Sequence, residues 1–384
     1  MKNYVERKIS EKIIEASSRY SVLTITGPRQ TGKTTLARHL FPDYPYYSLE
    51  NPDIKMLVHE DPVGFLNSSK NMVLDEVQNA PQLLSYIQGL VDEEPERRFV
   101  LTGSSNFSII KSISQSLSGR TAVFELLPYS LEEIDDTETS TDQLLVSGAY
   151  PGVWSDGKEP YDFYSNYVTT YLERDVRDIV NIKDLDSFQK LLRICANRIG
   201  SIWNSSEVSN ELGVSVNTIK SWLSVLQASY VIVMLQPYFT NTRKRLTKSP
   251  KLYFIDSGLA AYLLEIESAN QLSRDRMRGH LFENLIITEA LKRRMNDGRN
   301  NNLCFYRDSN GNEVDLITKS EGRLNLYEIK SSETYHPEFE KGIKSFKSSF
   351  GDNVESSSII YAGRLENTNR DIKLINFKHL DSFM

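Results

Sequence analysis

The stretch GPRQTGKT at residues 27–34 decides the fold of the N-terminal part of this chain. It fits the pattern G-x-x-x-x-G-K-[ST], follows the apolar segment SVLTIT at 21–26 and precedes the helix-like segment TLARHL at 35–40. A strand, a glycine loop and a helix in this order surround phosphate oxygens with backbone N–H groups and with the positive end of a helix dipole. The sequence therefore predicts a nucleotide site formed by Gly27, Pro28, Arg29, Gln30, Thr31, Gly32, Lys33, Thr34 and Thr35.

Four side chains of this region have predicted roles in ATP hydrolysis. Lys33 would reach the β- and γ-phosphates as a catalytic cation, and the Thr34 hydroxyl would bind Mg²⁺. The apolar segment NMVL at 71–74 ends in Asp75 and Glu76. P-loop enzymes place such an acid near Mg²⁺ at the end of a neighbouring parallel strand, so Asp75 would hold the metal. Glu76 would polarise the attacking water, which predicts an ATPase and not a passive binder.

Two further positions are candidates at the same site. The segment RFVLT at 98–102 leads to Asn106, which, like Ser105, could contact the γ-phosphate or orient water. An ordinary turn after a strand explains either residue equally well. Arg120 could stabilise charge in the transition state, either in its own chain or from a neighbouring subunit, and a surface arginine is the equal alternative.

Length and composition limit the class of protein. The 384 residues predict two or three domains, and the net charge of −6 means that any nucleic-acid-binding surface must be local. Cys195 and Cys304 show no pairing or metal-binding spacing, so we expect both to be reduced and buried. The N-terminus does not resemble a signal peptide, and no apolar run approaches the length of a membrane span. We therefore expect a cytoplasmic protein with no membrane contact.

The pattern along the chain predicts an α/β protein with several domains. Apolar strands alternate with helices to about residue 127, which predicts an ATPase domain at 1–135 with a parallel sheet covered on both faces. The segment SSEVSNELGVSVNTIKSWLSVL at 205–226 reads as two helices, with Gly213 in the turn and Ser215 as the cap of the second. Strands at 230–236 and 251–255 would follow. Residues 136–257 are therefore predicted to form a helical linker and a winged helix-turn-helix domain.

The loop between those two strands is strongly basic. It reads NTRKRLTKSPK at 241–251 and contains no acid. On the second helix, Asn217 and Lys220 are the side chains placed to read a DNA groove. DNA contact and protein–protein packing remain equal alternatives for this region, and DNA contact rests mainly on the basic residues Arg243, Lys244, Arg245, Lys248 and Lys251.

A second constellation lies in residues 258–384. A helix at 278–294 carries Glu283, and strands at 313–317 and 324–330 are predicted to pair as a hairpin. Since side chains alternate along a strand, Glu328 and Lys330 share one face, and Asp315 can lie opposite them. The three carboxylates are ligands that Mg²⁺ or Mn²⁺ prefer, and Lys330 would stabilise a pentavalent phosphate. An exposed charged hairpin is the alternative.

Together these motifs resemble a known family. The order GPRQTGKTT, LDEVQNAP, LTGSSN, SLSGR, LLPYS, SGAYPGV, YFIDSGL, RGHLFENLI, FYRDSNGNEVDLI and YEIKSS resembles prokaryotic AAA-type P-loop ATPases with a C-terminal DUF4143 domain. The resemblance covers nearly the whole chain. It implies an ATPase module, a winged helix and an α/β domain similar to the PD-(D/E)xK nucleases, which have the restriction-endonuclease-like fold. It also implies that Asp315 and Glu328 bind metal, that Lys330 is catalytic and that Glu283 supports them.

Two functions are consistent with these features. The first is an ATP-driven switch coupled to a metal-dependent nuclease-like domain that acts on nucleic acid, with ATP and Mg²⁺ as cofactors and Mn²⁺ as a second option at the C-terminal site. The second is a regulatory ATPase that acts through protein partners and carries a catalytically silent nuclease-like scaffold. The helical lid of AAA+ proteins, with its second sensor arginine, is not evident at 147–197, so an oligomer remains open.

Overall fold

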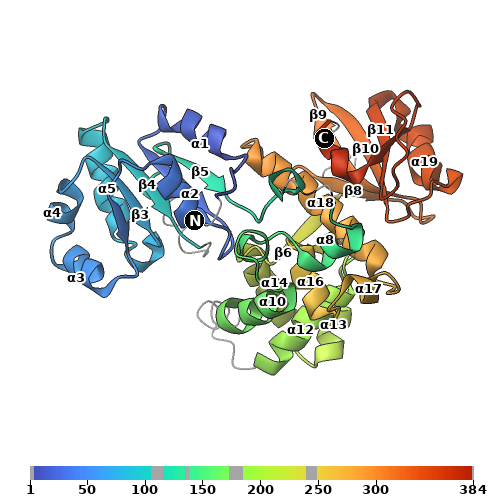
Figure 1. Ribbon diagram of the computed structural model, residues 1–384, viewed down its shortest axis with the longest axis horizontal. Helices are drawn as coiled ribbons and strands as arrows, with labels where there is room; N and C mark the ends of the chain where they lie inside the picture. Colours follow the sequence, from blue (N-terminus) through green and yellow to red (C-terminus); the bar gives the residue numbers. More distant parts are fainter. Residues whose placement is uncertain are drawn as a thin grey trace.

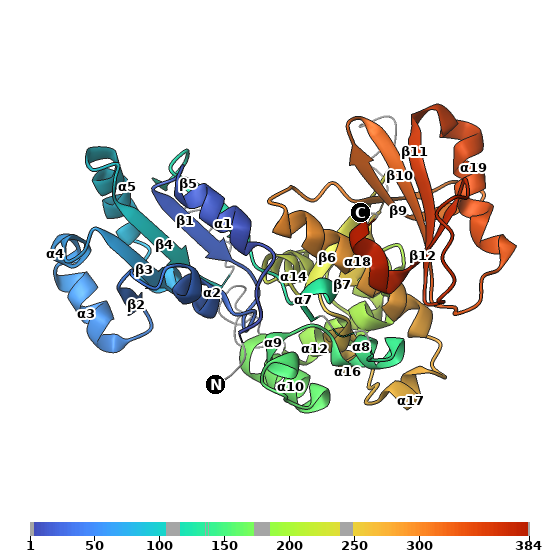
Figure 2. The same cartoon turned by 45° about the horizontal axis from the view of Figure 1, so that its top comes forward.

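The computed structural model describes residues 4–104, 116–134, 136, 138–172, 185–238 and 249–382. An N-terminal α/β domain lies at one end of the molecule, and a helical middle part and a C-terminal α/β part lie together at the other (Figure 1). One extended segment after β5 leads from the first domain to the rest, and helix α18 lies where the three parts meet (Figures 1 and 2).

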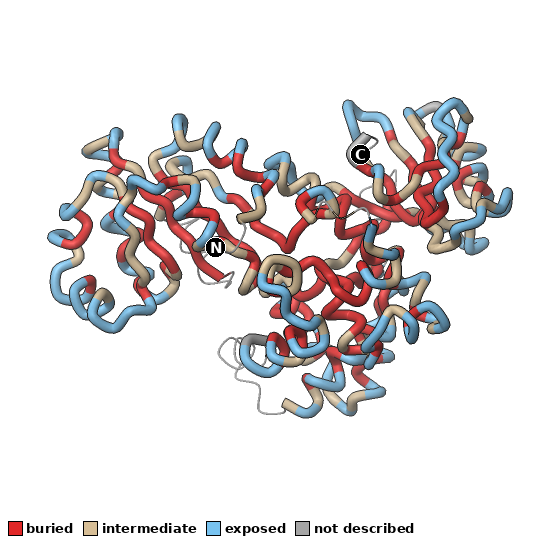
Figure 3. Tube along the Cα trace, viewed as in Figure 1, coloured by how far each residue is buried: buried red, intermediate tan, exposed pale blue. Residues whose placement is uncertain are grey.

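The N-terminal domain is built on a five-stranded sheet in the order β2-β3-β4-β1-β5, and its strands are parallel, as the sequence predicts. One face packs against α1 and α2 and the other against α3, α4 and α5, so the inner strands β1, β3 and β4 are buried on both sides (Figure 3). The strands are β1 (Val22–Thr26), β2 (Tyr46–Ser48), β3 (Asn71–Asp75), β4 (Arg98–Thr102) and β5 (Thr121–Glu125). The helices are α1 (Ser10–Ser17), α2 (Lys33–Leu40), α3 (Pro52–Glu60), α4 (Pro62–Asn67), η1 (Val77–Asn79) and α5 (Leu83–Glu93).

The middle part is mainly helical. Gly213 adopts a left-handed φ of 69° between α13 and α14, and the Ser215 side chain accepts the Thr218 N–H at 3.0 Å as the cap of α14. The predicted helix, glycine turn and capped helix are therefore confirmed. The elements are α7 (Leu131–Ile134), α8 (Thr141–Ser147), α9 (Pro151–Trp154), α10 (Pro160–Tyr167), η2 (Val168–Leu172), α12 (Leu185–Asn197), α13 (Ser205–Leu212), α14 (Val216–Ala228), β6 (Ile232–Pro237), β7 (Lys251–Phe254), α16 (Ser257–Leu263) and α17 (Ala269–Leu272).

The C-terminal part shares its sheet with the middle part. The antiparallel pair β6–β7 joins β8, which gives a seven-stranded sheet among the described residues in the order β12-β11-β10-β9-β8-β6-β7. The core cluster that starts at Leu127 also continues to Leu380. The sheet and core thus cross the boundary drawn at 257/258. The remaining elements are α18 (Arg278–Asn296), β8 (Cys304–Arg307), β9 (Glu313–Ser320), β10 (Arg323–Lys330), η3 (Pro337–Glu340), α19 (Lys341–Phe350), η4 (Gly351–Asn353), β11 (Val354–Tyr361), β12 (Lys373–Asn376) and η5 (Phe377–Ser382).

The motifs SGAYPGV and YFIDSGL meet inside the middle part. Asp256 accepts the Ala149 N–H at 2.7 Å and the Leu259 N–H at 3.0 Å, so it both caps α16 and ties it to the turn after α8. At Gly148, φ is 63° and a Cβ atom would lie 2.1 Å from the Tyr164 hydroxyl oxygen. These residues therefore stabilise the fold.

Over the described residues, no helix combines the length and apolar character needed to cross a bilayer.

Candidate nucleotide and metal sites

The predicted phosphate loop lies between β1 and α2. Gly27 has a φ of +137°, and a Cβ atom there would lie 2.3 Å from the backbone oxygen of Leu126. Gly32 is left-handed, with a φ of 90°, and is the N-cap of α2. Both positions therefore need glycine for backbone reasons, and the loop ends at the N-terminus of α2.

Lys33 lies across this loop. Its Nζ donates to the backbone oxygens of Gly27 at 3.1 Å and of Pro28 at 2.7 Å, and the residue is buried. The Thr31 hydroxyl also donates to the Pro28 oxygen, at 3.0 Å. The phosphate loop therefore holds Lys33 in position, and the Lys33 ammonium lies beside the proposed phosphate-binding site.

Asp75, at the end of β3, organises the predicted Mg²⁺ site. It accepts the Thr34 hydroxyl at 3.0 Å and the Tyr46 hydroxyl at 2.7 Å, and it also accepts the Thr102 hydroxyl. Burial, followed by the hydrogen bond to Asp75, raises the pKa of Tyr46 to about 12. A hydroxyl and a carboxylate at this spacing are oxygen ligands that suit Mg²⁺. The sequence analysis did not single out Tyr46 or Thr102.

The strand that carries Asp75 is not a direct neighbour of β1. Strand β4 lies between them in the sheet, so the expectation of an adjacent strand was wrong. Asp75 still reaches Thr34, because its side chain crosses the end of β4 beside Thr102. Thr102, at the end of β4, is therefore part of the site. The sequence signal that could have identified it is a hydroxyl residue at the end of an apolar strand.

Glu76 adopts a left-handed backbone conformation, with a φ of 56°. Its carboxylate accepts a hydrogen bond from the Gln78 side chain and another from the Ser104 N–H at 3.4 Å, while the Gln78 side chain also donates to the Ser104 hydroxyl at 3.2 Å. This non-glycine residue in the left-handed region directs the carboxylate towards the end of β4. The polar residues Gln78 and Ser104 therefore hold the predicted catalytic base.

The structure separates Arg120 from the phosphate loop of its own chain. Arg120 precedes β5, whereas the loop follows the neighbouring parallel strand β1, so the two lie at opposite ends of adjacent strands. Its guanidinium instead binds Asp92, with Nε 2.6 Å from Oδ1. Of the alternatives for Arg120, a contact in cis is therefore excluded, because a strand-start position cannot reach a strand-end site, and the surface ion pair agrees with the surface-arginine alternative. Asn106 and Ser105 lie outside the described residues.

A buried arginine that sequence analysis missed links the phosphate loop to the rest of the protein. Arg7 is 5% exposed and donates to the Thr31 backbone oxygen at 2.9 Å, to the Leu127 oxygen at 2.7 Å and to Glu133 Oε1 at 3.0 Å. Glu133 also accepts the Ser130 N–H at 2.8 Å. Because 126 residues separate Arg7 from Glu133, no local sequence pattern reveals the pair.

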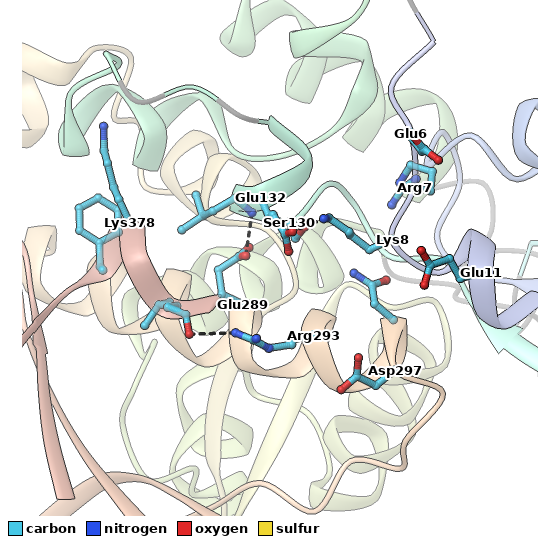
Figure 4. A pocket seen from close by; sticks show the side chains of 14 residues that line it. Glu6, Arg7, Lys8, Glu11, Ser130, Glu132, Glu289, Arg293, Asp297 and Lys378 are labelled. Carbon is cyan, nitrogen blue, oxygen red and sulfur yellow. Dashed lines mark hydrogen bonds and ion pairs between the residues drawn. The ribbon is translucent and has the colours of Figure 1, made fainter. Parts of the chain in front are cut away.

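The segment of residues 126–133, which accepts the Arg7 hydrogen bonds at Leu127 and Glu133, also contacts α18 (Figure 4). Glu289 accepts the Leu131 N–H at 2.8 Å, and the Lys292 ammonium donates to Glu289 at 2.7 Å and to the Tyr129 oxygen at 2.8 Å. Both charged side chains are buried, and burial raises the pKa of Glu289 although Lys292 lowers it. A cavity of about 410 Å³ lies at this junction, lined among others by Lys8, Glu11, Glu132, Arg293, Asp297 and Lys378. One short segment thus contacts both the phosphate loop and α18.

A second cavity adjoins the phosphate loop. Its volume is about 380 Å³, and Gly32, Thr35 and Leu36 line one side of it. Tyr4, Arg7 and Tyr129 form a second side, and residues 151–158 of the middle part close it, including Pro151, Ser155, Asp156 and Lys158. The space next to the phosphate cradle is therefore bounded by both parts of the protein.

The C-terminal acidic residues converge at one end of the second sheet. Oxygen atoms of Glu283, Glu313 and Asp315 lie within 4.8 Å of one another. Glu283 projects from α18, and the other two lie on β9. The structure thus brings Glu283 and Asp315 together, as the sequence predicts, and adds Glu313, which shares a strand face with Asp315 at a spacing of two residues.

Glu328 and Lys330 lie beside this cluster on β10. The Lys330 ammonium is 2.6 Å from Glu328 Oε1 and 3.6 Å from Asp315 Oδ2, and the Ile329 N–H donates to Asp315 at 2.8 Å. Burial and the nearby Asp315 carboxylate raise the pKa of Glu328 to about 8. Glu328 is 8% exposed, and its Oε2 has no hydrogen-bond partner. Glu328 is therefore a buried carboxylate with one oxygen paired to Lys330 and the other left without a partner.

Lys251 occupies a place that the sequence analysis did not predict. It is 2% exposed, begins β7, and its ammonium lies 3.0 Å from Glu283 Oε1 and also bonds to Glu313. Burial opposes its charge, but the carboxylates of Glu283, Asp315 and Glu313 raise its pKa. The expectation that Lys251 belongs to the basic loop that would contact DNA was therefore wrong. The other four basic residues of that loop lie outside the described residues, whereas Asn217 and Lys220 are exposed on α14.

Comparisons with known proteins divide the chain into three matched regions. An AAA domain family (AAA_14) matches residues 19–135, a domain of unknown function (DUF8612) matches 138–270, and a second domain of unknown function (DUF4143) matches 278–380. The sheet position of Lys251 thus falls in the second match, whereas its carboxylate partners fall in the third.

Similar full-length proteins come from bacteria and archaea. An uncharacterised protein of Mycobacterium tuberculosis is 29% identical over 335 residues, which covers 85% of this chain and 74% of that protein. An uncharacterised protein of Methanocaldococcus jannaschii is 24% identical over 397 residues and covers 93% and 85%. The Walker-type ATPase PABY2304 of Pyrococcus abyssi aligns with a TM-score of 0.48 at 16% identity, over 68% of this chain and 96% of that one.

Proposed function

We propose that ATP turnover controls metal-dependent cleavage of nucleic acid at the C-terminal carboxylate cluster, in a chain whose residues 19–135 match an AAA domain family and whose residues 278–380 match DUF4143. The observation that carries this proposal is the segment 126–133. It contacts the phosphate loop at Gly27 and, through Arg7, at Thr31, and it contacts α18 through Glu289. The two candidate sites are thereby joined by hydrogen bonds and one helix.

At the first site, each side chain has a defined part. The loop N–H groups and the start of α2 bind the phosphates, and Lys33 leaves its loop carbonyls to reach the β- and γ-oxygens. Thr34 and Asp75 hold Mg²⁺, which neutralises charge on the phosphates. Glu76 turns from Gln78 and Ser104 to accept a proton from the attacking water. The nucleoside occupies the adjoining cavity, in contact with the middle part.

At the second site, the carboxylates would bind Mg²⁺ or Mn²⁺, which would polarise a phosphodiester and lower the pKa of a bound water. Glu283, Asp315 and Glu328, together with Glu313, supply oxygen ligands on one face. Lys330 is placed to stabilise the charge that develops on the phosphate oxygens. The raised pKa of Glu328 fits a group whose ionised form is completed by a cation.

Coupling between the sites follows from their shared helix. Glu283 and Glu289 lie six residues apart on α18, which corresponds to about 9 Å along the helix axis. A movement of the 126–133 segment on nucleotide binding would therefore shift the helix that carries a metal ligand. The α13–α14 pair and the β6–β7 pair would act as a winged helix that holds DNA, with Asn217 and Lys220 facing the groove.

A matched pair of variants tests the cleavage proposal. The full chain is incubated with Mn²⁺ and either supercoiled or single-stranded DNA, and Lys330→Ala is compared with Lys319→Ala, an exposed lysine on β9. We expect the wild type and Lys319→Ala to cleave and Lys330→Ala to lose at least 100-fold in rate, about 2.7 kcal/mol of transition-state stabilisation. Equal cleavage by both variants would remove Lys330 from the mechanism.

The alternative is a regulatory ATPase with a silent scaffold. One observation favours it, since Lys251 already forms ion pairs with two of the carboxylates that would bind metal. The same assay separates the alternatives, because an absence of cleavage with every DNA substrate, in a protein that still hydrolyses ATP, would favour the scaffold.

A further inference from the structure

The buried Lys251 ammonium lies inside the proposed metal site. Its Nζ bonds to one oxygen of Glu283 and one of Glu313, two of the three carboxylates that approach within 4.8 Å of one another. Tyr253, two residues further along β7, donates its hydroxyl to the same Glu283 oxygen at 2.5 Å. Phe305 lies beneath the ammonium, with its ring centroid 5.4 Å from Nζ. Lys251 is therefore held by the site from several sides.

We propose that Lys251 is an internal cation that limits this site to one divalent metal ion, by taking the place that a second ion would occupy. A divalent cation binds carboxylate oxygens at about 2.0–2.6 Å, whereas the ammonium already lies at bonding distance from the Glu283 and Glu313 oxygens. Overlap and charge repulsion exclude a divalent cation from the position between Glu283 and Glu313 that the ammonium fills. A metal ion is left with the Asp315 and Glu328 side of the cluster.

The charges of the site agree with a single ion. Four carboxylates face the cluster from three elements: Glu283 from α18, Glu313 and Asp315 from β9, and Glu328 from β10. The three cations that pair with them, Lys251, Lys330 and Arg307, leave a formal charge of −1, so one divalent cation brings the site to +1 and a second would bring it to +3. A second ion would leave an excess of positive charge among partly buried groups, which is costly in a medium of low dielectric constant.

Lys251 comes from outside the region of the chain that matches DUF4143. Lys251 lies within the region matched at 138–270 and starts the edge strand of the shared sheet, whereas Glu283, Glu313 and Asp315 belong to the region at 278–380. The carboxylate cluster is thus completed by a residue from the β6–β7 pair, which follows the α13–α14 pair. The inference rests on the proposed metal site and concerns how many ions it holds.

Titration of the full chain with Mn²⁺ in the absence of nucleotide tests the inference. The wild type, Lys251→Met, Lys251→Arg and Asp315→Asn are compared by calorimetry and by the electron paramagnetic resonance of free Mn²⁺. We expect one ion per chain in the wild type and in Lys251→Arg, and in Lys251→Met either a second ion or at least ten-fold tighter binding. Asp315→Asn is expected to lose the ion that the wild type binds.

The outcomes are distinguishable. If Asp315→Asn loses Mn²⁺ while Lys251→Met binds the same number of ions with the same affinity as the wild type, the role of Lys251 is refuted and the metal site stands. If Asp315→Asn keeps wild-type binding, or no variant binds, the metal site and this inference both fail. Should Lys251→Met unfold, its refolding is compared in Mn²⁺ and in NaCl of equal ionic strength. Recovery only in Mn²⁺ supports the inference, and recovery in neither refutes it.

Discussion

Removal of the Arg7 side chain tests the connection between the phosphate loop and the rest of the protein. In Arg7→Met, the buried Glu133 carboxylate loses its guanidinium partner, and the Thr31 and Leu127 oxygens lose their donors. Breaking a buried ion pair from one side costs about 3–5 kcal/mol. We expect the lower end of this range, because Glu133 keeps its hydrogen bonds from the Ser130 and Lys8 N–H groups at 2.8 Å.

This loss is best measured as local opening, because unfolding of a chain with several domains is not described by one free energy. A loss of about 3 kcal/mol corresponds to roughly a 100-fold increase in the equilibrium for opening. Amide hydrogen exchange in peptides that cover residues 27–36 should therefore become about 100-fold faster in Arg7→Met. Adding Glu133→Gln should recover part of the protection, since the buried charge is then removed together with its partner.

The control is another arginine in a bidentate ion pair with a carboxylate. Arg120 binds Asp92 at the surface, at the end of the strands that lies away from the phosphate loop. Arg120→Met should leave exchange in residues 27–36 unchanged, because exposed pairs contribute little and this pair does not touch the loop. Equal exchange in Arg7→Met and the wild type, or an equal effect of the two variants, would refute the role given to Arg7.

Three other predictions address the first site and its surroundings. Gly27→Ala should lose nucleotide binding by more than ten-fold in a fluorescent-nucleotide titration, because its Cβ would lie 2.3 Å from the Leu126 oxygen, and binding at wild-type affinity would contradict the loop geometry. Glu76→Gln should bind ATP normally and lose at least 100-fold in phosphate release, so a normal turnover rate would exclude Glu76 as the base. Burial raises the pKa of Glu125 above 4.5, although a hydrogen bond from Tyr230 lowers it, so the folded chain keeps this proton to a higher pH than the unfolded chain. Stability should therefore fall as the pH rises above about 4.5, and Glu125→Gln should weaken the dependence of the melting temperature on pH over that range. If the melting temperatures of the wild type and the variant change with pH in parallel, Glu125 does not titrate as described.

The sequence predicted the parts of the fold and site that are encoded locally. The phosphate loop, Asp75 with Glu76, and the capped turn at Ser215 each lie within one contiguous segment, so backbone preference and hydrophobic pattern were enough. The hairpin partners Asp315 and Glu328 were also predictable, because a short turn fixes which side chains face each other.

Contacts between distant segments could not be predicted in the same way. Lys251 was interpreted from its place in a basic run, but the chain turns into a buried strand at that residue and places its ammonium among carboxylates from α18 and β9. Arg120 was one candidate for the nucleotide site, with a surface arginine as the equal alternative, and strand direction places it at the end of β5 away from the phosphate loop. The Arg7–Glu133 pair depends on the path of the segment after β5, which only tertiary structure determines.

The central claim is that the nucleotide state of the first site controls chemistry at the second. The most direct measurement is the rate of Mn²⁺-dependent DNA cleavage with and without ATP, in the wild type and in Lys33→Ala, at equal concentrations of free metal. We predict a rate that changes at least ten-fold with ATP in the wild type and does not respond to ATP in Lys33→Ala. A wild-type rate that is the same with and without ATP, or cleavage that is absent under both conditions, would contradict the claim.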